Sequence, residues 1–491
     1  MIADTFDLPA FAVFIALFAL VTGMGFLASR WRKPSTLEHL DEWGLGGRSF
    51  GTWITWFLVG GDFYTAYTVI AVPALVYASG AFGFFALPYT IIVYPIVFFI
   101  MPRLWQIASK GGHVTAADVV HARYGSRKLE LAVAFTGVMA TMPYIALQLI
   151  GMEVVIKALG LNGELPLIAA FLVLAFYTYS SGLRAPALIA FVKDILIYIV
   201  VLVAVAIIPL KLGGYEAVFH AADAAFKAKG AGGIVLAPAQ YLPYATLALG
   251  SALAAFMYPH TLTGIFASKS GDTIRKNAIL LPAYTLLLGL IALLGYMAYA
   301  AGIKPATNND VVPLLFHTLF PGWFAGFAMA AIAIGALVPA AVMSIGASNL
   351  FTRNVWKAYV NPAVTPAGEA QVAKLASMFV KVGALLVILF MPTQFALDLQ
   401  LLGGLWILQT FPSLVFGIFT SFFRAPALLA GWAVGIFGGS YIAWTDGLKP
   451  LHTLHFDGTA YTVYIGLLAL VANVLVAAVG SAVLGTAGSK K

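Results

Sequence analysis

The stretch Val59-Gly60-Gly61-Asp62-Phe63-Tyr64-Thr65 interrupts an apolar run and decides how the fold is interpreted. Two adjacent glycines let a helix unwind, and the aspartate behind them adds a charge. A second interruption, Tyr258-Pro259-His260, lies in the middle of a later apolar run, where proline removes a backbone hydrogen bond and clashes with the preceding turn. Backbone groups freed at these two breaks cannot face lipid, so we expect both to face a cavity lined by protein.

Composition places both breaks in a membrane protein. Of the 491 residues, 62% are hydrophobic and only 9% are charged, whereas a typical soluble domain has about a quarter charged residues. A hydrocarbon core about 30 Å thick requires about 20 apolar residues per helix. Runs of this length predict an all-α membrane protein with about thirteen transmembrane helices, at residues 8–28, 52–79, 83–106, 129–158, 165–182, 186–210, 240–266, 277–302, 322–350, 371–391, 396–419, 425–444 and 461–485.

The basic residues predict how these helices are oriented. With the N-terminus outside, the inner segments hold nineteen of the 27 Lys and Arg residues and the outer segments hold six, while Lys193 and Lys381 lie within spans. The positive-inside rule therefore predicts an outer N-terminus and an inner C-terminus, in a bacterial-type inner (plasma) membrane. The same rule explains the pI of 9.4 without any nucleic-acid partner. The first run, 8–28, is expected to be a retained span, since no basic segment precedes it.

Several functional classes are disfavoured by what the sequence lacks. It has no cysteine, which excludes disulfides, thiolate metal sites and cysteine nucleophiles. No His-Glu-x-x-His or Gly-x-Ser-x-Gly motif is present, so we expect no metal, no cofactor and no enzyme activity. A solute sensor would need an appended signalling domain, and we expect none. A channel leaves no distinguishing motif and stays open as an alternative.

The two breaks also predict an internal repeat. They lie in the second and seventh predicted spans, so they begin two halves of five spans each. Broken helices at equivalent positions of two halves indicate the central site of a transporter. The expected organisation is a leading span, two halves and two trailing spans, at residues 1–35, 36–239, 240–420 and 421–491.

Three motifs resemble the sodium:solute symporter family. Residues 42–51 are similar to the Gly-Gly-Arg segment before that family's first core helix, 113–125 to its inner loop, and 350–357 to the end of its eighth core helix. The resemblance implies a five-plus-five inverted-repeat core like that of a bacterial leucine transporter. Residues 258–261, 335–340 and 400–404 further resemble bacterial monocarboxylate permeases, which take up lactate, pyruvate and similar acids.

The resemblance also implies where a sodium site would lie. The family's carbonyl donors correspond to Gly60, Phe63 and Gly335, and its two hydroxyl residues to Val338 and Pro339. Sodium is a hard cation and needs about five or six oxygens, by the logic that governs calcium and magnesium. Valine and proline supply no side-chain oxygen, so we expect a degenerate sodium site.

A second sodium site known in some members is also lost, since its hydroxyls correspond to Ala341 and Val342. An alignment shift of three or four residues would instead bring Ser344 to the cation site. With the alignment as it stands, the coupling ion is predicted to be a proton rather than sodium.

Three residues are predicted to carry coupling protons or cations. Asp62 at the first break matches an Asp that binds the cation in the family's proline transporters, although it could instead cap the broken helix. Asp194 matches an Asp along the family's cation exit route, although it could form a structural pair with Lys193. Helix neighbours point about 100° apart, so we expect these two not to face each other. A histidine side chain commonly titrates near neutral pH and can donate hydrogen bonds to a carboxylate, so His260 is predicted both to bind an organic acid and to carry a proton.

Polar and aromatic residues around the breaks are predicted to bind substrate. No arginine is predicted at mid-membrane in the central spans, which favours a small monoanion over a dicarboxylate or phosphate. The predicted substrate-binding residues are Tyr64, Thr65, Tyr67, Thr68, Tyr144, Gln148, Tyr258, His260, Trp406 and Gln409. The alternative for each is interhelical packing.

The predicted function is therefore secondary active import of small monocarboxylates by alternating access, with proton coupling or at least without sodium. The alternative is a sodium-coupled symporter of another small organic solute. The expected partners are the monocarboxylate and the lipid bilayer. A monomer is compatible with the sequence, which leaves the oligomeric state open.

Overall fold

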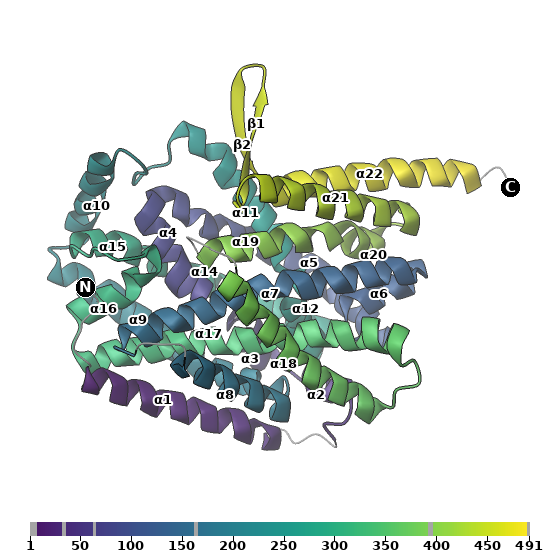
Figure 1. The fold of residues 1–491 in the computed structure, drawn as a ribbon, viewed down its shortest axis with the longest axis horizontal. Helices are drawn as coiled ribbons and strands as arrows, with labels where there is room; N and C mark the ends of the chain where they lie inside the picture. Colours follow the sequence, from purple (N-terminus) through teal and green to yellow (C-terminus); the bar gives the residue numbers. More distant parts are fainter. Residues whose placement is uncertain (1–6, 32–35, 62–64, 162–164, 391–395, 489–491) are drawn as a thin grey trace.

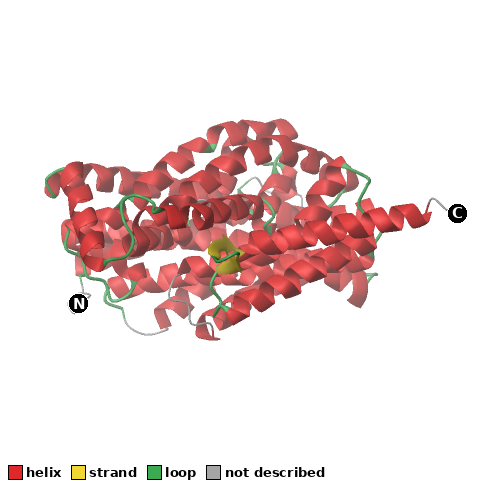
Figure 2. Ribbon diagram, turned by 90° about the horizontal axis from the view of Figure 1, so that it is seen from above, coloured by secondary structure: helices red, strands yellow, loops and turns green. Residues whose placement is uncertain are grey.

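The computed structural model describes residues 7–31, 36–61, 65–161, 165–390 and 396–488 of the chain. Its helices run mainly along the long axis of an elongated bundle (Figure 1). Helix α1 begins at the left end of this view, and α22 ends at the right end, where Figure 2 also shows it extending beyond its neighbours. The start of α1 and the end of α22 thus lie at opposite ends of the bundle.

Within the described residues, ten helical stretches are long and apolar enough to cross a membrane, judged by length and composition. They are Leu8–Arg30, Tyr67–Gly111, Arg127–Ala158, Arg184–Lys211, Gly271–Ala300, Gly322–Val360, Pro366–Val387, Leu397–Phe419, Ala425–Thr445 and Ile465–Gly485. The helices within them are α1 (Leu8–Leu27), α4 (Val72–Ser79), α5 (Ala86–Gly111), α7 (Arg127–Ala158), α9 (Arg184–Lys211), α13 (Gly271–Leu280), α14 (Pro282–Ala292), α15 (Leu294–Ala300), α17 (Gly322–Phe351), α18 (Pro366–Phe390), α19 (Ala396–Ile407), α20 (Gly417–Phe419), α21 (Ala425–Thr445) and α22 (Ile465–Gly488).

Helix α17 is the centre of the bundle. It is buried along almost its whole length and packs against α1, α7, α9, α12 and α18. Small residues permit this packing, because a Cβ atom on Gly326 would lie 2.1 Å from the carbonyl oxygen of Ala10. Close backbone contact through small residues is the usual way that helices associate inside membranes.

The first predicted break is present. Helix α3 (Thr52–Thr55) continues into a π-helical turn, η3 (Trp56–Gly60), and a second π-helical turn, η5 (Tyr67–Ala71), leads into α4. Residues 62–64 lie outside the described residues. The hydrogen-bond register of the helix therefore changes on both sides of the break, and such π-helical turns often occur at functional sites.

The second predicted break is also present. Helix α11 (Tyr241–Ala255) ends before Tyr258, whose φ of −60° and ψ of 141° are extended, and α12 (Pro259–Ala267) begins at the next residue. Proline suits the first position of a helix because its missing N–H would have no partner there. The proline in this run therefore starts a new half-helix rather than kinking a continuous one.

Backbone contacts join the half-helix α3, which Phe50 precedes, to the half-helix α12, which Ser268 follows. Phe50 and Ser268 form a parallel β-bridge, in which the N–H of Phe50 donates to Ala267 O at 3.1 Å and the N–H of Lys269 donates to Phe50 O at 2.9 Å. Thr55 and Ser268 add a contact of 3.3 Å between their hydroxyl oxygens. Phe50 and Ser268 are both buried.

Shorter helices complete the bundle. They are α2 (Leu40–Leu45), α6 (Ala116–Tyr124), α8 (Leu165–Ser181), α10 (Tyr215–Lys229) and α16 (Val311–Leu319). Together with the ten long stretches, α8 and the α11–α12 pair overlie all thirteen predicted spans. The number of crossings, their orientation, the inverted repeat and the four-part division of the chain stay predictions.

The all-helical class of the fold is confirmed, and one hairpin among the described residues is an exception to it. Strands β1 (Leu451–Phe456) and β2 (Thr459–Tyr464) form an antiparallel hairpin that projects from the bundle (Figure 1). Its turn residues, Asp457 and Gly458, have φ values of 48° and 72°. Asp-Gly is a preferred sequence for such two-residue turns because both positions need positive φ.

Candidate transport site at the two helix breaks

The two glycines of the first break make room for side chains from other helices. A Cβ atom on Gly60 would lie 2.3 Å from Cε2 of Tyr284 in α14. A Cβ atom on Gly61 would lie 2.9 Å from Nζ of Lys193 and 3.2 Å from Oδ2 of Asp194, both in α9. Distances below 3.0 Å are not compatible with a real Cβ. A Cβ at Gly60 would have to displace the Tyr284 ring, whereas a Cβ at Gly61 would meet the flexible end of the Lys193 side chain.

A buried ion pair contacts the first break. Nζ of Lys193 lies 3.0 Å from Oδ1 of Asp194, and neither side chain is exposed. The same ammonium donates to the carbonyl of Gly61, and the hydroxyl of Tyr284 donates to Oδ2 of Asp194 at 2.6 Å. The prediction that Lys193 and Asp194 do not face each other is wrong, because the long lysine side chain bends toward the carboxylate.

Two predicted substrate-binding residues stabilise the restart of the first broken helix. Oε1 of Gln148 in α7 accepts the N–H of Ala66 at 3.0 Å, and Oγ1 of Thr65 accepts the N–H of Tyr67 at 3.0 Å. N–H groups in the first turn of a helix have no intrahelical partner. Thr65 and Gln148 supply such partners, so the structure gives both a structural role beside any contact with substrate.

A cavity lies beside the second break. Its lining residues come from both broken helices and from α5, α7, α14 and α19, and they are Val59, Tyr89, Val93, Val97, Tyr144, Ala255, Phe256, Tyr258, His260, Thr261, Leu281 and Gln400. The free volume of about 30 Å³ holds roughly two water molecules. A solute of several heavy atoms would need these side chains to move apart, so the site is closed in this conformation.

Three aromatic rings meet in this cavity. The ring of His260 lies 5.4 Å from that of Tyr144 and 5.2 Å from that of Tyr258, measured between centroids. The Tyr258 hydroxyl donates to the carbonyl of Gln400 at 3.0 Å. The ring of Tyr67 lies 6.2 Å from the ring of Tyr89, measured between centroids, and Tyr89 also lines this cavity. The structure thus brings together the predicted residues Tyr144, Tyr258 and His260.

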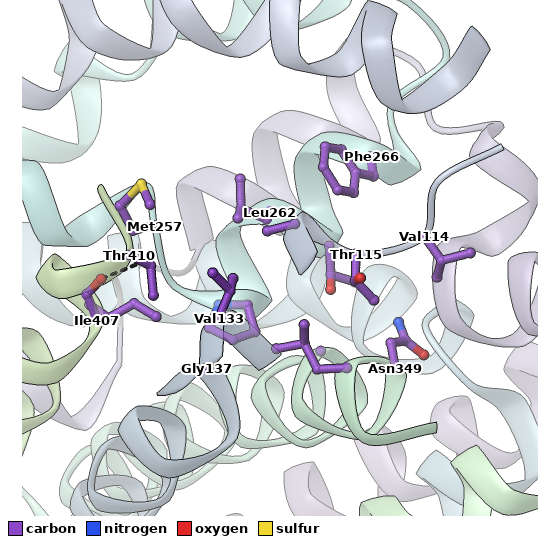
Figure 3. Close-up of a pocket in the computed structure, with 15 residues that line it drawn as sticks. Val114, Thr115, Val133, Gly137, Met257, Leu262, Phe266, Asn349, Ile407 and Thr410 are labelled. Atoms are coloured by element: carbon purple, nitrogen blue, oxygen red, sulfur yellow. Dashed lines mark hydrogen bonds between the residues drawn. The ribbon is translucent and has the colours of Figure 1, made fainter. Parts of the chain in front are cut away.

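A second cavity also contacts the second break, at Met257 and Pro259. Figure 3 shows Met257, Ile407 and Thr410 at one end of it and Val114 and Asn349 at the other. Its free volume is about 20 Å³. The complete lining is Val114, Thr115, Ala116, Val133, Gly137, Met257, Pro259, Leu262, Thr263, Phe266, Gly346, Asn349, Leu350, Ile407 and Thr410. Residues of the second break therefore line two narrow cavities, and the sequence did not indicate this one.

The side chains of Trp406 and Gln409 form hydrogen bonds with the trailing helices α21 and α22. Nε1 of Trp406 donates to Oγ of Ser440 in α21 at 3.0 Å. Nε2 of Gln409 donates to the carbonyls of Leu405 and Gly466, and its Oε1 accepts from Asn473 in α22. Neither residue lines the two cavities at the second break, so their contacts are those of helix packing.

The predicted sodium-site residues on the central helix are buried within α17. Val338 and Pro339 contribute only carbon side chains, and Gly335 none. The hydroxyl of Ser344 donates to the carbonyl of Ala341 in its own helix at 2.8 Å. Thr68 is buried in η5. The predicted residues Asp62, Phe63 and Tyr64 lie outside the described residues.

The three family-like motifs meet at one end of the bundle. Nη2 of Arg48 donates to the carbonyl of His113 at 2.6 Å, and Nδ2 of Asn354 donates to Oδ1 of Asp118 at 2.7 Å and to Oε1 of Glu130 at 2.9 Å. Burial lowers the pKa of the His113 imidazole, although the carboxylate of Asp118 opposes this shift. Hydrogen bonds among the motifs therefore connect α2, α6 and the end of α17.

Comparison with known proteins identifies this arrangement. A sequence model described as the sodium:solute symporter family matches residues 43–435. The chain belongs to the sodium:solute symporter family. The predicted resemblance is confirmed by this match.

Relatives in the sodium:solute symporter family cover nearly the whole chain. The "Monocarboxylate transport permease protein" of Rhizobium johnstonii is 74% identical over 475 residues, which are 97% of each chain. The "Uncharacterized symporter YodF" of Bacillus subtilis is 33% identical over 96% of this chain and 92% of its own. A solved structure of a Na+-coupled sialic acid symporter shares the fold, with a TM-score of 0.79, 16% identity and 98% coverage of both chains.

These comparisons establish the general function of this symporter-family protein. The family and its relatives are symporters and permeases, so the chain is a multi-pass membrane transporter of a small solute and not a catalyst of a chemical reaction. The structural likeness, at 16% identity, shows the fold alone.

Proposed function

We propose that this transporter imports small monocarboxylates, such as lactate or pyruvate, across a bacterial plasma membrane by alternating access. The observation that carries the proposal is the 74% identity, over 97% of both chains, with a protein named as a monocarboxylate transport permease. The proposed uptake is coupled to protons or proceeds without sodium, and it requires no cofactor.

The cavity at the second break suits a small monoanion. Its lining offers one imidazole, several hydroxyl groups and one amide, and it includes no arginine or lysine. Helix α12 begins at this cavity, and the N-terminus of a helix carries partial positive charge. Half-helix N-termini serve anionic substrate groups in transporters of this architecture. We propose that His260 and the first turn of α12 hold the carboxylate, while Tyr144 and Tyr258 contact the remainder of the molecule.

The two cavities support alternating access. Both contact the second break, and each has room for only one or two water molecules, by the usual requirement of about 10–15 Å³ each. A carboxylic acid of several heavy atoms can pass only if first one cavity and then the other widens. We propose that the break itself separates the two access routes.

The proposal of sodium independence rests on the first break and α17. A hard cation needs several oxygen ligands, and Val338 and Pro339 offer none from their side chains. The alternative is a sodium-coupled symporter of another small organic solute. One observation favours this alternative, because the structural neighbour is described as Na+-coupled.

Uptake by purified protein in liposomes tests the proposal. We expect labelled lactate or pyruvate to accumulate when the outside is acidic and choline replaces sodium, with the membrane potential clamped. For one proton per substrate, a gradient of one pH unit supports at most about tenfold accumulation. Accumulation driven by sodium alone, with no effect of the pH gradient, would show that the coupling is wrong. Transport of an amino acid or a sugar, but of no short acid, would show that the substrate class is wrong.

A further inference from the structure

The first break contains an ammonium group that the sodium-site comparison does not anticipate. Nζ of Lys193 donates to the carbonyl of Gly61 and lies 3.0 Å from Oδ1 of Asp194, with both side chains fully buried. A Cβ atom on Gly61 would come within 2.9 Å of this nitrogen. The second glycine of the pair thus leaves the space that the ammonium fills.

Carbonyl groups at the end of the first half-helix need hydrogen-bond donors from outside the helix, and a positively charged donor suits them. The last carbonyls of a helix have no intrahelical donor and carry the negative end of the helix dipole. Helix α3 and its π-helical turn end at Gly60, which places the carbonyl of Gly61 in this position. In transporters with broken helices, carbonyls of this kind coordinate the coupling Na+ or H+.

The groups around Lys193 suit an ammonium better than a metal ion. An ammonium has three N–H donors and needs three acceptors at most, whereas a hard cation needs about five or six oxygens. The carbonyl of Gly61 accepts from it, Oδ1 of Asp194 forms an ion pair with it at 3.0 Å, and the Tyr284 hydroxyl donates to the other carboxylate oxygen at 2.6 Å. A buried ion pair is stable only with good geometry and further hydrogen bonds, and this pair has both.

We propose that the Lys193 ammonium takes the place of a coupling sodium ion at the first break, as a cation attached covalently to α9. The inference rests on the proposed sodium-independent uptake and names the residue that makes sodium unnecessary. Because the Lys193 ammonium is attached covalently, it can balance the partial negative charge of the carbonyls at the first break and stay there throughout the transport cycle. A sodium gradient then has no bound ion through which it can drive transport.

The first test measures binding of ²²Na+ to the purified, full-length protein, which involves no organic substrate. We expect no saturable ²²Na+ binding, and no increase in melting temperature when NaCl replaces choline chloride. Saturable ²²Na+ binding to the unmodified protein would overturn the inference. If the protein carries no monocarboxylate but also binds no sodium, the proposed function fails while this inference stands.

The second test replaces the ammonium. We expect Lys193→Met to lower the initial rate of uptake by about tenfold or more, because it leaves Asp194 buried without its counter-ion. Lys381→Met is the matched control, since Lys381 is a fully buried lysine in α18 that donates to the carbonyl of Ser377 at 3.3 Å. Uptake by Lys193→Met at the rate of the unmodified protein would overturn the inference. Should Lys193→Met fail to fold, the sodium-binding measurement decides alone.

The third test restores the oxygens of a sodium site. In the triple variant Lys193→Ala/Val338→Ser/Pro339→Ser, the ammonium is removed and two hydroxyl groups return. We expect uptake by this variant to depend on sodium, with a saturable sodium response that the unmodified protein lacks. Uptake that is equally fast in sodium and in choline would overturn the inference, because the vacated position would then need no cation.

Discussion

The first and the second break differ in what surrounds the backbone where the helix is interrupted. At Gly60-Gly61 the backbone at the end of the π-helical turn is covered by protein groups, with Tyr284 against one glycine and Lys193 against the other. Residues at and beside Tyr258-Pro259-His260 line two cavities. Lipid cannot satisfy exposed backbone at either place. A pair of glycines therefore admits side chains from other helices, whereas a proline beside aromatic residues leaves small cavities.

This difference separates two tasks of a transporter. The first break holds a buried charge pair and its hydrogen bonds, so changes there should act mainly on folding and on the ion requirement. The second break lines the cavity in which we propose that the solute binds, so changes there should act mainly on affinity. Variants at each break can contradict or sharpen this division.

The largest effect is expected at the first break. In Gly60→Ala the new methyl group would lie 2.3 Å from the Tyr284 ring, and such overpacking costs about 1–3 kcal/mol. We expect a matching loss of thermal stability in detergent and loss of transport. Gly51→Ala is the control, because its Cβ meets nothing within 4 Å and its φ is −78°. If both variants are equally stable, the first break is not tightly packed.

A more selective effect, on the affinity for the solute and not on transport as a whole, is expected at the second break. His260→Ala removes a donor to the proposed carboxylate, and a hydrogen bond to a charged group contributes about 1.5–3 kcal/mol. This corresponds to about 10–100-fold weaker binding, measured as a rise in the KM of lactate uptake with little change in melting temperature. His220→Ala, at an exposed position of α10, is the control. An unchanged KM would remove His260 from the binding site.

The smallest effect on transport is expected from Trp406→Phe. The variant loses the hydrogen bond to Ser440, which contributes about 0.5–1.5 kcal/mol to stability, and it leaves both cavities intact. We expect the melting temperature to fall slightly and KM to stay constant. A tenfold change in KM would show that the binding region reaches α21, contrary to the division between the two breaks.

Much of the fold could be predicted because a membrane restricts it. Long apolar runs must be helices in lipid, and a glycine pair or a mid-run proline marks where such a helix is interrupted. Hydropathy alone does not predict the hairpin of β1 and β2, because it carries no information on turns. Asp457-Gly458, between alternating residues, is the signal that would have predicted it.

The site could be predicted only in part, because side-chain direction depends on packing. The positions of His260 and Tyr258 followed from the proline beside them. The contact between Lys193 and Asp194 did not follow, since helix geometry fixes the Cα–Cβ direction and not where a long side chain ends. Trp406 and Gln409 are polar residues in a span, but only the structure shows that they contact α21 and α22.

The β-bridge between Phe50 and Ser268 has a mechanical consequence. Phe50, Ala267 and Ser268 are buried, so breaking the hydrogen bond from the N–H of Phe50 to Ala267 O would leave polar groups unsatisfied at a cost of several kcal/mol. We therefore expect α3 and α12 to move together. A movement at the second break, where we propose that the solute binds, would then be transmitted to the segment that carries the glycine pair.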